Sequence, residues 1–387
     1  MEYIPRPAFF AGSFHEPDSL GLTSREFQAF AQRRGLPFFS VHAGPSTRKW
    51  TEGDLTVLEL QRGKTAIDLD DNLHFDPLLW RHTWRAEFAL SQFKPDIIHV
   101  TGPGDCGIMG AYLARAMGVP LVASWHRDLH EFAARRLQQL LSFVPSPYLD
   151  FAVDHTQRHT LESVALFYRF ARVLLAPSPD RMEMLRRRTG KPVFLMRPGV
   201  DTELFHPARR FRQDGAFTIG YVGQLRPERN VRFLAEIERS LPDGNHRFLI
   251  AGEGPERDWL ERNMRRAEFA GVLHGEQLAR ACANMDLFVC PSGSHTPVLE
   301  ALASGVPVVV FAPGFPVRGG ADGFVARDSE DFLWGVKEIL SNPSMHQSMR
   351  EEARRGALGA SWDRVFEQVY RVYSSTQTHT PDLRAAS

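Results

Sequence analysis

Short apolar runs alternate with amphipathic stretches along most of the chain, and this alternation is the main guide to its fold. In the first half, the apolar runs predict β-strands at 38–42, 96–100, 121–124 and 173–176. Between these runs, apolar residues recur with helical spacing at 108–117 and 179–188. Strands that alternate with helices in this way indicate an α/β protein built on parallel sheets.

A polar stretch then divides the chain. Residues 197–217, RPGVDTELFHPARRFRQDGAF, combine charged residues with Pro and Gly, which is typical of an interdomain linker. A second α/β series follows, with strands predicted at 218–222 and 247–251 and helices at 231–240 and 256–266. We therefore expect two Rossmann-like domains, at residues 1–205 and 206–361. An aromatic-rich helix at 362–375 is expected to pack back on the first domain, ahead of a tail at 376–387.

The segment from residue 287 to residue 311 carries the clearest chemistry. Apolar runs at 287–290 and 308–311 predict two strands joined by a helix, with Thr296 as its N-cap, Pro297 at its first position and Gly305 at its end. A helix that opens at the carboxyl end of a parallel strand directs N–H groups and partial positive charge toward a phosphate. Glu300, further along this helix, can accept hydrogen bonds from sugar hydroxyls beside that phosphate. The segment predicts a nucleotide-sugar site in outline.

Composition narrows the class of protein. A chain of 387 residues is long for one core, and its 46 basic and 46 acidic residues cancel, so we expect no nucleic-acid partner. Cys106, Cys282 and Cys290 are far apart, which favours core packing in a reducing compartment over disulfides or metal ligation. The N-terminus lacks a signal-peptide pattern, and no apolar run approaches the roughly 18 residues of a membrane span. We expect a soluble, cytoplasmic protein.

Several motifs occur in the order that a known family shows. They are RPGVDTELFHP, YVGQLRPERN, FLIAGEGPE, LEALASGVPVVV and SWDRVFEQVYRVY. The chain resembles the family 4 retaining glycosyltransferases of the GT-B fold, in which two Rossmann-like domains face each other across a cleft. The resemblance implies a nucleotide-sugar donor on the second domain and a glycan, lipid or small-molecule acceptor on the first. It also implies that neither a metal ion nor a cofactor takes part.

The same resemblance assigns roles to individual residues. Glu300 matches the glutamate that holds the donor ribose, and His126 matches a histidine that contacts the donor sugar, which makes it the candidate catalytic residue. The remaining donor-site candidates lie in three loops: Gly223, Gln224, Arg226 and Arg229 near the diphosphate, Gly252 and Gly254 near the base, and Ser294, His295 and Thr296 around the transferred sugar. Gly102 and Gly104 are assigned to the acceptor side.

The chain also departs from the family pattern. Ser292 stands where the family has the first glutamate of its E-x7-E motif, and Gln224 stands where it has an arginine. The loop GSHT and the stretch APGFPVRGGADG are both shorter than usual. These departures keep a second hypothesis open, that of a non-catalytic nucleotide-binding or scaffold relative. An epimerase on the same fold is a third reading, which the linker and C-terminal motifs disfavour.

Two further patterns have alternative interpretations. Residues 102–107 form a literal GxGxxG between a strand and a helix, which is a dinucleotide-binding signature. Their position in an inner βα unit favours a tight glycine turn at the ligand cleft instead. Residues 129–149 mix apolar residues with Arg135 and Arg136, so this stretch is predicted either as a core-facing helix or as a peripheral contact with a membrane or lipid acceptor.

Overall fold

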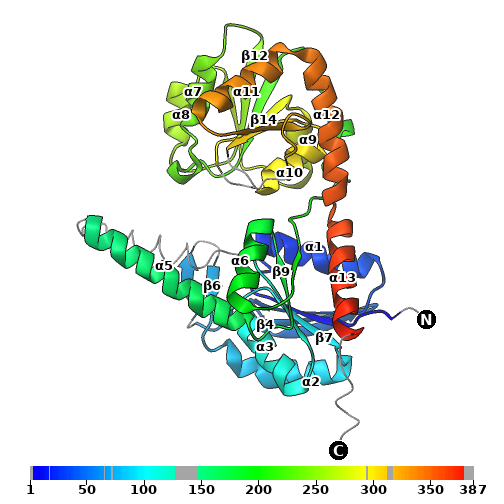
Figure 1. Cartoon of the computed structure of the whole chain (residues 1–387). Coiled ribbons are helices and arrows are strands. Elements are labelled where there is room, and N and C mark those ends of the chain that lie inside the picture. The colour runs from blue at the N-terminus through cyan, green and yellow to red at the C-terminus, as the bar shows by residue number, and fades with distance from the viewer. Residues whose placement is uncertain are drawn as a thin grey trace, which may run out of the picture. The chain divides into compact units, whose positions relative to one another are not determined.

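A computed structural model describes residues 3–16, 18–64, 66–70, 73–126, 146–292, 295–311 and 317–378 of the chain. These residues form two compact units (Figure 1). The first unit comprises Met1–Arg197 together with Val365–Ser387, and the second comprises Pro198–Arg364. The sequence placed the boundary between residues 205 and 206. Each unit is described by itself below.

The first unit is built on a sheet with strand order β10-β9-β8-β7-β1-β2-β4-β3. Its strands are β1 (Pro7–Ala11), β2 (Phe38–Gly44), β3 (Arg48–Glu52), β4 (Leu55–Gln61), β7 (Ile97–Val100), β8 (Leu121–Ser124), β9 (Val173–Ala176) and β10 (Val193–Leu195). All neighbours are parallel except β3, which runs antiparallel to β4. The order reverses between β1 and β7, where a doubly wound sheet opens a crevice at its carboxyl edge. A separate ribbon pairs β5 (Ile67–Asp70) with β6 (Leu73–Phe75).

Helices cover this sheet. They are α1 (Ser19–Arg33), α2 (Thr83–Phe93), α3 (Asp105–Met117), α5 (Ser146–Tyr168) and α6 (Pro179–Thr189), with a short 3-10 turn, η1 (Leu79–His82), before α2. The strands are almost continuously buried, as expected for a parallel sheet with both faces covered. Helix α1 begins with the Asp18 side chain accepting from the Gly21 N–H, and α6 begins in the same way at Ser178. Residues 129–149, for which the sequence left a membrane contact open, fall mostly outside the described residues.

The C-terminal helix α13 (Trp362–Thr378) contributes to the core of the first unit. The Phe366 ring stacks on Phe27 of α1, with ring centroids 4.4 Å apart and planes inclined by 11°. Tyr373 is completely buried. The aromatic residues that mark this helix in the sequence are therefore core residues of the first unit.

The second unit has a six-stranded parallel sheet of order β13-β12-β11-β14-β15-β16. Its strands are β11 (Phe217–Val222), β12 (His246–Ala251), β13 (Ala267–Gly271), β14 (Leu287–Cys290), β15 (Val308–Phe311) and β16 (Gly323–Ala326). The helical elements are η2 (Pro207–Arg209), η3 (Pro227–Arg229), α7 (Phe233–Ser240), α8 (Arg257–Asn263), α9 (Gly275–Ala283), α10 (His295–Ala303), α11 (Ser329–Ser341), α12 (Pro343–Ala357) and η4 (Leu358–Ala360). This sheet reverses its order between β11 and β14.

Alternate residues of its central strands pack into two separate cores. Leu287 and Val289 join a cluster with α7, α8 and α11, whereas Phe288 and Cys290 join another with α9, α10 and α12. Because successive side chains of a strand point to opposite faces, this division produces three layers, helix, sheet and helix (Figure 1). The α/β architecture predicted from the sequence is confirmed in both units.

Three predicted helix boundaries are wrong by three residues or in their capping residue. The helix predicted at 108–117 begins at Asp105. The helix predicted at 256–266 ends at Asn263, because the Glu238 carboxylate accepts the backbone N–H groups of Arg265 and Arg266 and turns the chain toward β13. The helix that carries Glu300 begins at His295, so Thr296 lies inside its first turn and is not its N-cap.

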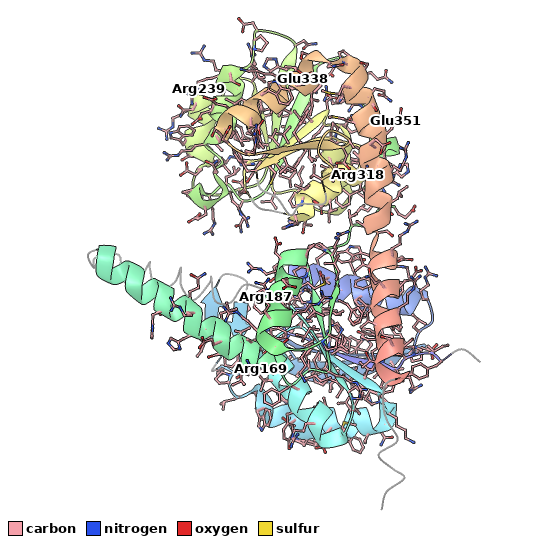
Figure 2. The ribbon with its side chains drawn as sticks, viewed as in Figure 1. Arg169, Arg187, Arg239, Arg318, Glu338 and Glu351 are labelled. Carbon is pink, nitrogen blue, oxygen red and sulfur yellow. The ribbon has the colours of Figure 1, made fainter. Side chains whose placement is uncertain are left out.

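Figure 2 shows two charged side chains on the outside of the second unit, the labelled Arg239 and Glu351, and both residues are exposed. The three cysteines are buried, in agreement with the core packing predicted from the sequence, and none forms a disulfide. Among the helices of the described segments, none combines the length and apolar character needed to cross a bilayer.

Candidate nucleotide-sugar site

Most of the predicted donor residues gather along one edge of the second unit. Strands β12, β11 and β14 are neighbours, and the chain leaves their carboxyl ends at Gly252, at Gly223 and just ahead of α10. This edge includes the point where the strand order reverses. Open α/β sheets bind ligands outside the carboxyl ends of their strands at such a reversal. The structure therefore brings the three predicted donor loops together at a position suited to a nucleotide.

Two of these loops are joined through their backbones. Leu225 N–H donates to the Glu253 carbonyl at 2.9 Å, and Glu256 N–H donates to the Leu225 carbonyl at 3.0 Å. A Cβ at Gly252 would lie 1.9 Å from the Gly223 carbonyl oxygen, and one at Gly254 would lie 2.3 Å from that of Leu225. Only glycine at these positions lets the two loops approach so closely.

In the loop that follows β11, Arg229 is the side chain best placed to bind a phosphate. It ends η3, is half-buried, and makes no side-chain hydrogen bond or ion pair with any described residue. Its neighbour Tyr221 donates its hydroxyl to the Gln224 carbonyl at 3.1 Å. Burial raises the pKa of Tyr221, and the positive charge of Arg229 offsets part of that increase. Arg226 is exposed at the start of the same turn.

Glu300 lies in the second turn of α10 and is 9% exposed. Within the described part of the chain, its carboxylate has no hydrogen-bond or ion-pair partner. Burial accordingly raises the pKa of Glu300 to about 8. A buried carboxylate without a partner is costly unless a ligand supplies hydrogen-bond donors, and the two hydroxyls of a ribose would supply them.

The loop expected around the transferred sugar is only partly described. His295 is exposed and Thr296 is half-buried at the start of α10, whereas Ser294 lies outside the described residues. Ser292, at the position of the family's first glutamate, uses its carbonyl to accept a contact from the Cys290 thiol at 2.7 Å. Helix α10 follows β14 directly and presents its positive N-terminal end at the same sheet edge.

His126 belongs to the first unit, at the end of a chain of buried hydrogen bonds. The Tyr373 hydroxyl lies 2.6 Å from His99 Nδ1, His99 Nε2 lies 2.9 Å from Ser124 Oγ, and Ser124 Oγ lies 2.7 Å from His126 Nε2. The first three residues are at most 1% exposed, and His126 is half-buried. Sequence reasoning missed Tyr373, His99 and Ser124. The available signal was a histidine inside the apolar strand β7.

The direction of these hydrogen bonds follows from the Tyr373 hydroxyl. Its one hydrogen-bond partner among the described residues is His99, so it must donate to Nδ1 or leave a buried proton without an acceptor. Burial lowers the pKa of His99 to about 3, so this neutral ring carries its proton on Nε2 and donates to Ser124. Ser124 Oγ lies 2.7 Å from His126 Nε2 but 3.5 Å from its other acceptor, the Val100 carbonyl. We therefore assign its proton to His126 Nε2, which leaves the His126 proton on Nδ1. Burial also lowers the pKa of His126 to about 4, so near neutral pH its imidazole is an uncharged Nδ1–H donor.

The two acceptor-side candidates lie beside His126. Gly102 and Gly104 follow β7, the strand that pairs with β8 ahead of His126. A Cβ at Gly102 would lie 3.3 Å from the Tyr168 hydroxyl, which donates to the Ser124 carbonyl at 3.1 Å. Gly104 is the N-cap residue of α3. The GxGxxG stretch thus forms a tight glycine turn next to the histidine.

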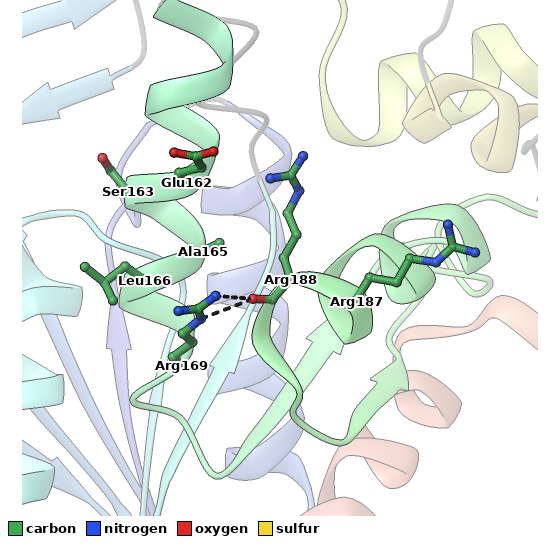
Figure 3. Close-up of a pocket in the computed structure, with 7 residues that line it drawn as sticks. All are labelled: Glu162, Ser163, Ala165, Leu166, Arg169, Arg187 and Arg188. Carbon is green, nitrogen blue, oxygen red and sulfur yellow. Dashed lines mark hydrogen bonds between the residues drawn. The ribbon is translucent and has the colours of Figure 1, made fainter.

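A separate hollow of about 470 Å³ lies between α5 and α6 of the first unit (Figure 3). Arg169 crosses it and donates two hydrogen bonds to the Arg188 carbonyl, at 3.1 and 2.9 Å. None of the residues that line it is a predicted site residue. This hollow is therefore separate from the predicted nucleotide-binding residues, which lie on the second unit.

Comparison with known families identifies the class of this protein. The family described as Glycosyl transferases group 1 matches residues 216–342, and the one described as Glycosyltransferase Family 4 matches residues 65–204. A GDP-mannose-dependent alpha-mannosyltransferase of Mycobacterium tuberculosis is 32% identical over 314 residues, covering 76% of this chain and 77% of that protein. The chain therefore belongs to glycosyltransferase family 4.

Further comparisons agree with this assignment. A GDP-mannose-dependent alpha-mannosyltransferase of Corynebacterium glutamicum is 29% identical over 388 residues, covering 95% of this chain and 88% of that one. Among solved structures, sucrose-phosphate synthase from Thermosynechococcus elongatus superposes with a TM-score of 0.69 at 15% identity, covering 97% and 100% of the two chains. The fold is GT-B, as the resemblance implied, and the protein is a glycosyltransferase.

Proposed function

We propose that the protein transfers mannose from GDP-mannose to a glycan or lipid acceptor, with retention of the anomeric configuration. The observation that supports the donor site is Glu300, a buried carboxylate with no hydrogen-bond or ion-pair partner among the described residues. It lies on α10, at the edge of the sheet where the strand order reverses. The choice of GDP-mannose rests on the names of the relatives from Mycobacterium tuberculosis and Corynebacterium glutamicum.

In this proposal the chemistry is electrostatic. The bond from the sugar to the diphosphate breaks, and negative charge builds on the leaving phosphate. Arg229 and the N–H groups at the start of α10 stabilise that charge, so that no metal ion or cofactor is needed there. Glu300 holds the ribose. His126 offers its Nδ1–H to a hydroxyl of the donor sugar and orients it. No side-chain nucleophile is assigned.

Calorimetric titration of the full chain with GDP, UDP and ADP tests the donor site. We expect GDP to bind and Glu300→Ala to lose about tenfold to a hundredfold in affinity, because two hydrogen bonds to the ribose are lost and each contributes about 0.5–1.5 kcal/mol. Glu268→Ala, at an exposed position in the same unit, is the control. GDP binding that survives in Glu300→Ala would remove Glu300 from the site, and preferred binding of UDP or ADP would overturn the choice of donor.

Turnover is then measured with GDP-mannose and a panel of phospholipid and glycan acceptors. NMR of the product's anomeric proton distinguishes retention from inversion. Nucleotide binding without transfer or hydrolysis for any acceptor would support a non-catalytic relative instead.

We also propose that the first unit has a surface patch that binds an anionic membrane. Trp80, Trp84 and Phe88, spaced four residues apart along η1 and α2, are 46%, 63% and 65% exposed. Tyr112 of α3 extends the patch, with its ring centroid 4.9 Å from that of Trp80, and Arg85 lies over Trp84. Exposed tryptophan, tyrosine and arginine together suit the interface of a bilayer with anionic headgroups.

Sedimentation with phosphatidylglycerol vesicles tests this surface. We expect Trp84→Ser to reduce the bound fraction, whereas Trp334→Ser, at a comparably exposed tryptophan of the second unit, leaves it unchanged. Equal binding by both variants would contradict the assignment.

A further inference from the structure

Three side chains of the first unit converge at the carboxyl side of neighbouring strands. His15 lies in the loop after β1, His42 in β2 and Glu59 in β4, and His42 and Glu59 are direct partners in the parallel register. One potential ligand atom from each of these residues lies within 4.8 Å of the other two. Glu59 Oε2 is 3.0 Å from His15 Nε2 and 3.8 Å from His42 Nε2. None of these residues belongs to the proposed donor site.

His42 is the unexplained member of this cluster. It is 1% exposed, and its Nε2 has no hydrogen-bond partner within the described segments. Its other nitrogen, Nδ1, faces Ser40 Oγ at 3.4 Å, and the Phe14 ring stacks on the imidazole at 3.8 Å, nearly parallel. The ring is thus held with Nε2 toward Glu59. The separation of 3.8 Å is too long for a hydrogen bond, so His42 Nε2 stays without a partner while Glu59 Oε2 is already met by His15.

Glu59 is arranged to present one oxygen to the histidines. Its Oε1 accepts from Ser46 Oγ at 2.6 Å and from Arg48 Nε at 3.1 Å, while Oε2 faces the two imidazoles. A Cβ at Gly44 would lie 2.8 Å from Oε2, so the glycine leaves room for the carboxylate. Metal-binding carboxylates and imidazoles are oriented by outer hydrogen bonds of this kind.

We propose that His15, His42 and Glu59 form a zinc-binding site on the first unit. Two imidazoles and one carboxylate are a ligand set that Zn²⁺ accepts, with a fourth position left for water or a ligand oxygen. Ligands about 2 Å from a tetrahedral ion lie roughly 3.3 Å apart, and the two distances from Glu59 Oε2 fall on either side of that value. The His15 side chain is 45% exposed, which gives the ion a route from solvent.

Arg48 is the competing cation. Its guanidinium pairs with Glu59 and reaches within 3.4 Å of Oε2, yet its side chain is 61% exposed and can turn into solvent when an ion arrives. The site does not depend on the proposed glycosyl transfer, so the two can fail separately.

The test is calorimetric titration of ZnCl2 into the chelator-treated full chain, kept reduced with a phosphine. We expect one Zn²⁺ per chain, and Co²⁺ in its place should give the visible absorption of a tetrahedral site. His15→Ala, at an exposed position that leaves the fold intact, should weaken binding at least about tenfold, as should Glu59→Gln. His159→Ala, at another exposed histidine of the first unit, is the matched control and should bind as the parent chain does.

Arg48→Ala separates the proposal from its alternative. If the cluster is a metal site, Arg48→Ala still takes up Zn²⁺, because Ser46 continues to hold Glu59 Oε1 and the competing cation is gone. Absence of Zn²⁺ uptake in both the parent chain and Arg48→Ala would show that the cluster is only an ion-pair network around Glu59. Uptake that persists unchanged in His15→Ala and Glu59→Gln would also overturn the site.

Discussion

The hydroxyl of Tyr373 lies 2.6 Å from Nδ1 of His99, and both residues are completely buried. One comes from the C-terminal helix and the other from a strand in the middle of the first unit's sheet. This contact begins the hydrogen-bond chain that fixes the protonation of His126. The C-terminal helix therefore contributes to the candidate site although it carries no residue predicted to touch a ligand.

Replacement of this tyrosine is expected to destabilise the protein. Tyr373→Phe leaves His99 Nδ1 buried without its donor, which should reduce the free energy of unfolding by about 1–3 kcal/mol in urea denaturation. Tyr370→Phe is a matched control on the same helix, because the buried Tyr370 hydroxyl has no hydrogen-bond partner within the described residues. That variant should be neutral or slightly stabilising. Equal losses for the two variants would show that the Tyr373 hydroxyl contributes nothing specific.

The tautomer of His126 is a second, independent prediction. ¹⁵N NMR of histidine-labelled protein should find the His126 proton on Nδ1 near neutral pH, and His126→Gln assigns the signal. Because burial lowers the pKa of His126 to about 4, the ring should stay neutral until the pH falls close to that value. Tyr373→Phe should mix the two tautomers, since the direction of the hydrogen-bond chain is then no longer imposed. A proton on Nε2 in the parent protein would contradict the assigned direction, whether or not the enzyme turns over.

The buried Glu300 should make the free energy of unfolding depend on pH. Burial raises its pKa from an ordinary value of 4.5 to about 8, so between these two values the native state holds a proton that the unfolded chain has lost. Stability should therefore fall as the pH rises through this window, by a few kcal/mol, and level off above it. The Glu300→Gln variant should not show this fall in stability, whereas the control Glu268→Gln should show it as the parent chain does. Urea denaturation of the nucleotide-free protein at about pH 5 and about pH 8.5 measures the difference. The same slope in Glu300→Gln and the parent would show that another group is responsible.

The hydrophobic pattern predicted β2, β7, β8, β9, β11, β12, β14 and β15 to within two residues, because buried parallel strands are short apolar runs bounded by polar turns. It did not predict the other strands, which include β1 in the middle of the first sheet. It placed the end of one helix wrongly for a tertiary reason. The N–H groups of Arg265 and Arg266 are held by Glu238 from a different helix, and no local pattern encodes that contact.

The same limit applies to the candidate site. His99 and Tyr373 are separated by 274 positions, so only the packing of the C-terminal helix brings them together. The cluster of His15, His42 and Glu59 likewise needs the strand order β1-β2-β4 to be known. Glu300, by contrast, could be found from the sequence, since its role depends on a local strand–helix unit.

Arg229 is predicted to recognise phosphate rather than base or ribose. Arg229→Ala should weaken GDP binding by about 1.5–3 kcal/mol, tenfold or more, while guanosine binding stays the same. Arg229→Lys should restore part of the loss, because it keeps the charge but not the planar fork. Arg239→Ala, at an exposed position of the same unit, is the control for net charge. Equal losses for GDP and guanosine would place Arg229 away from the diphosphate.

Gly252 tests whether the joined loops are needed for nucleotide binding. A Cβ at this position would lie 1.9 Å from the Gly223 carbonyl oxygen, and the backbone φ of +149° disfavours any other residue. Gly252→Ala must therefore separate the β11 and β12 loops, with an expected loss of more than about 2 kcal/mol in unfolding free energy. Gly359→Ala, where a Cβ would meet nothing within 4 Å, should cost little.

Both variants are measured by thermal unfolding with and without GDP. We expect GDP to stabilise Gly359→Ala as it does the parent chain, and to leave Gly252→Ala unchanged because the edge that receives the nucleotide has been opened. A Gly252→Ala protein that is destabilised yet still responds fully to GDP would show that the close approach serves the fold alone.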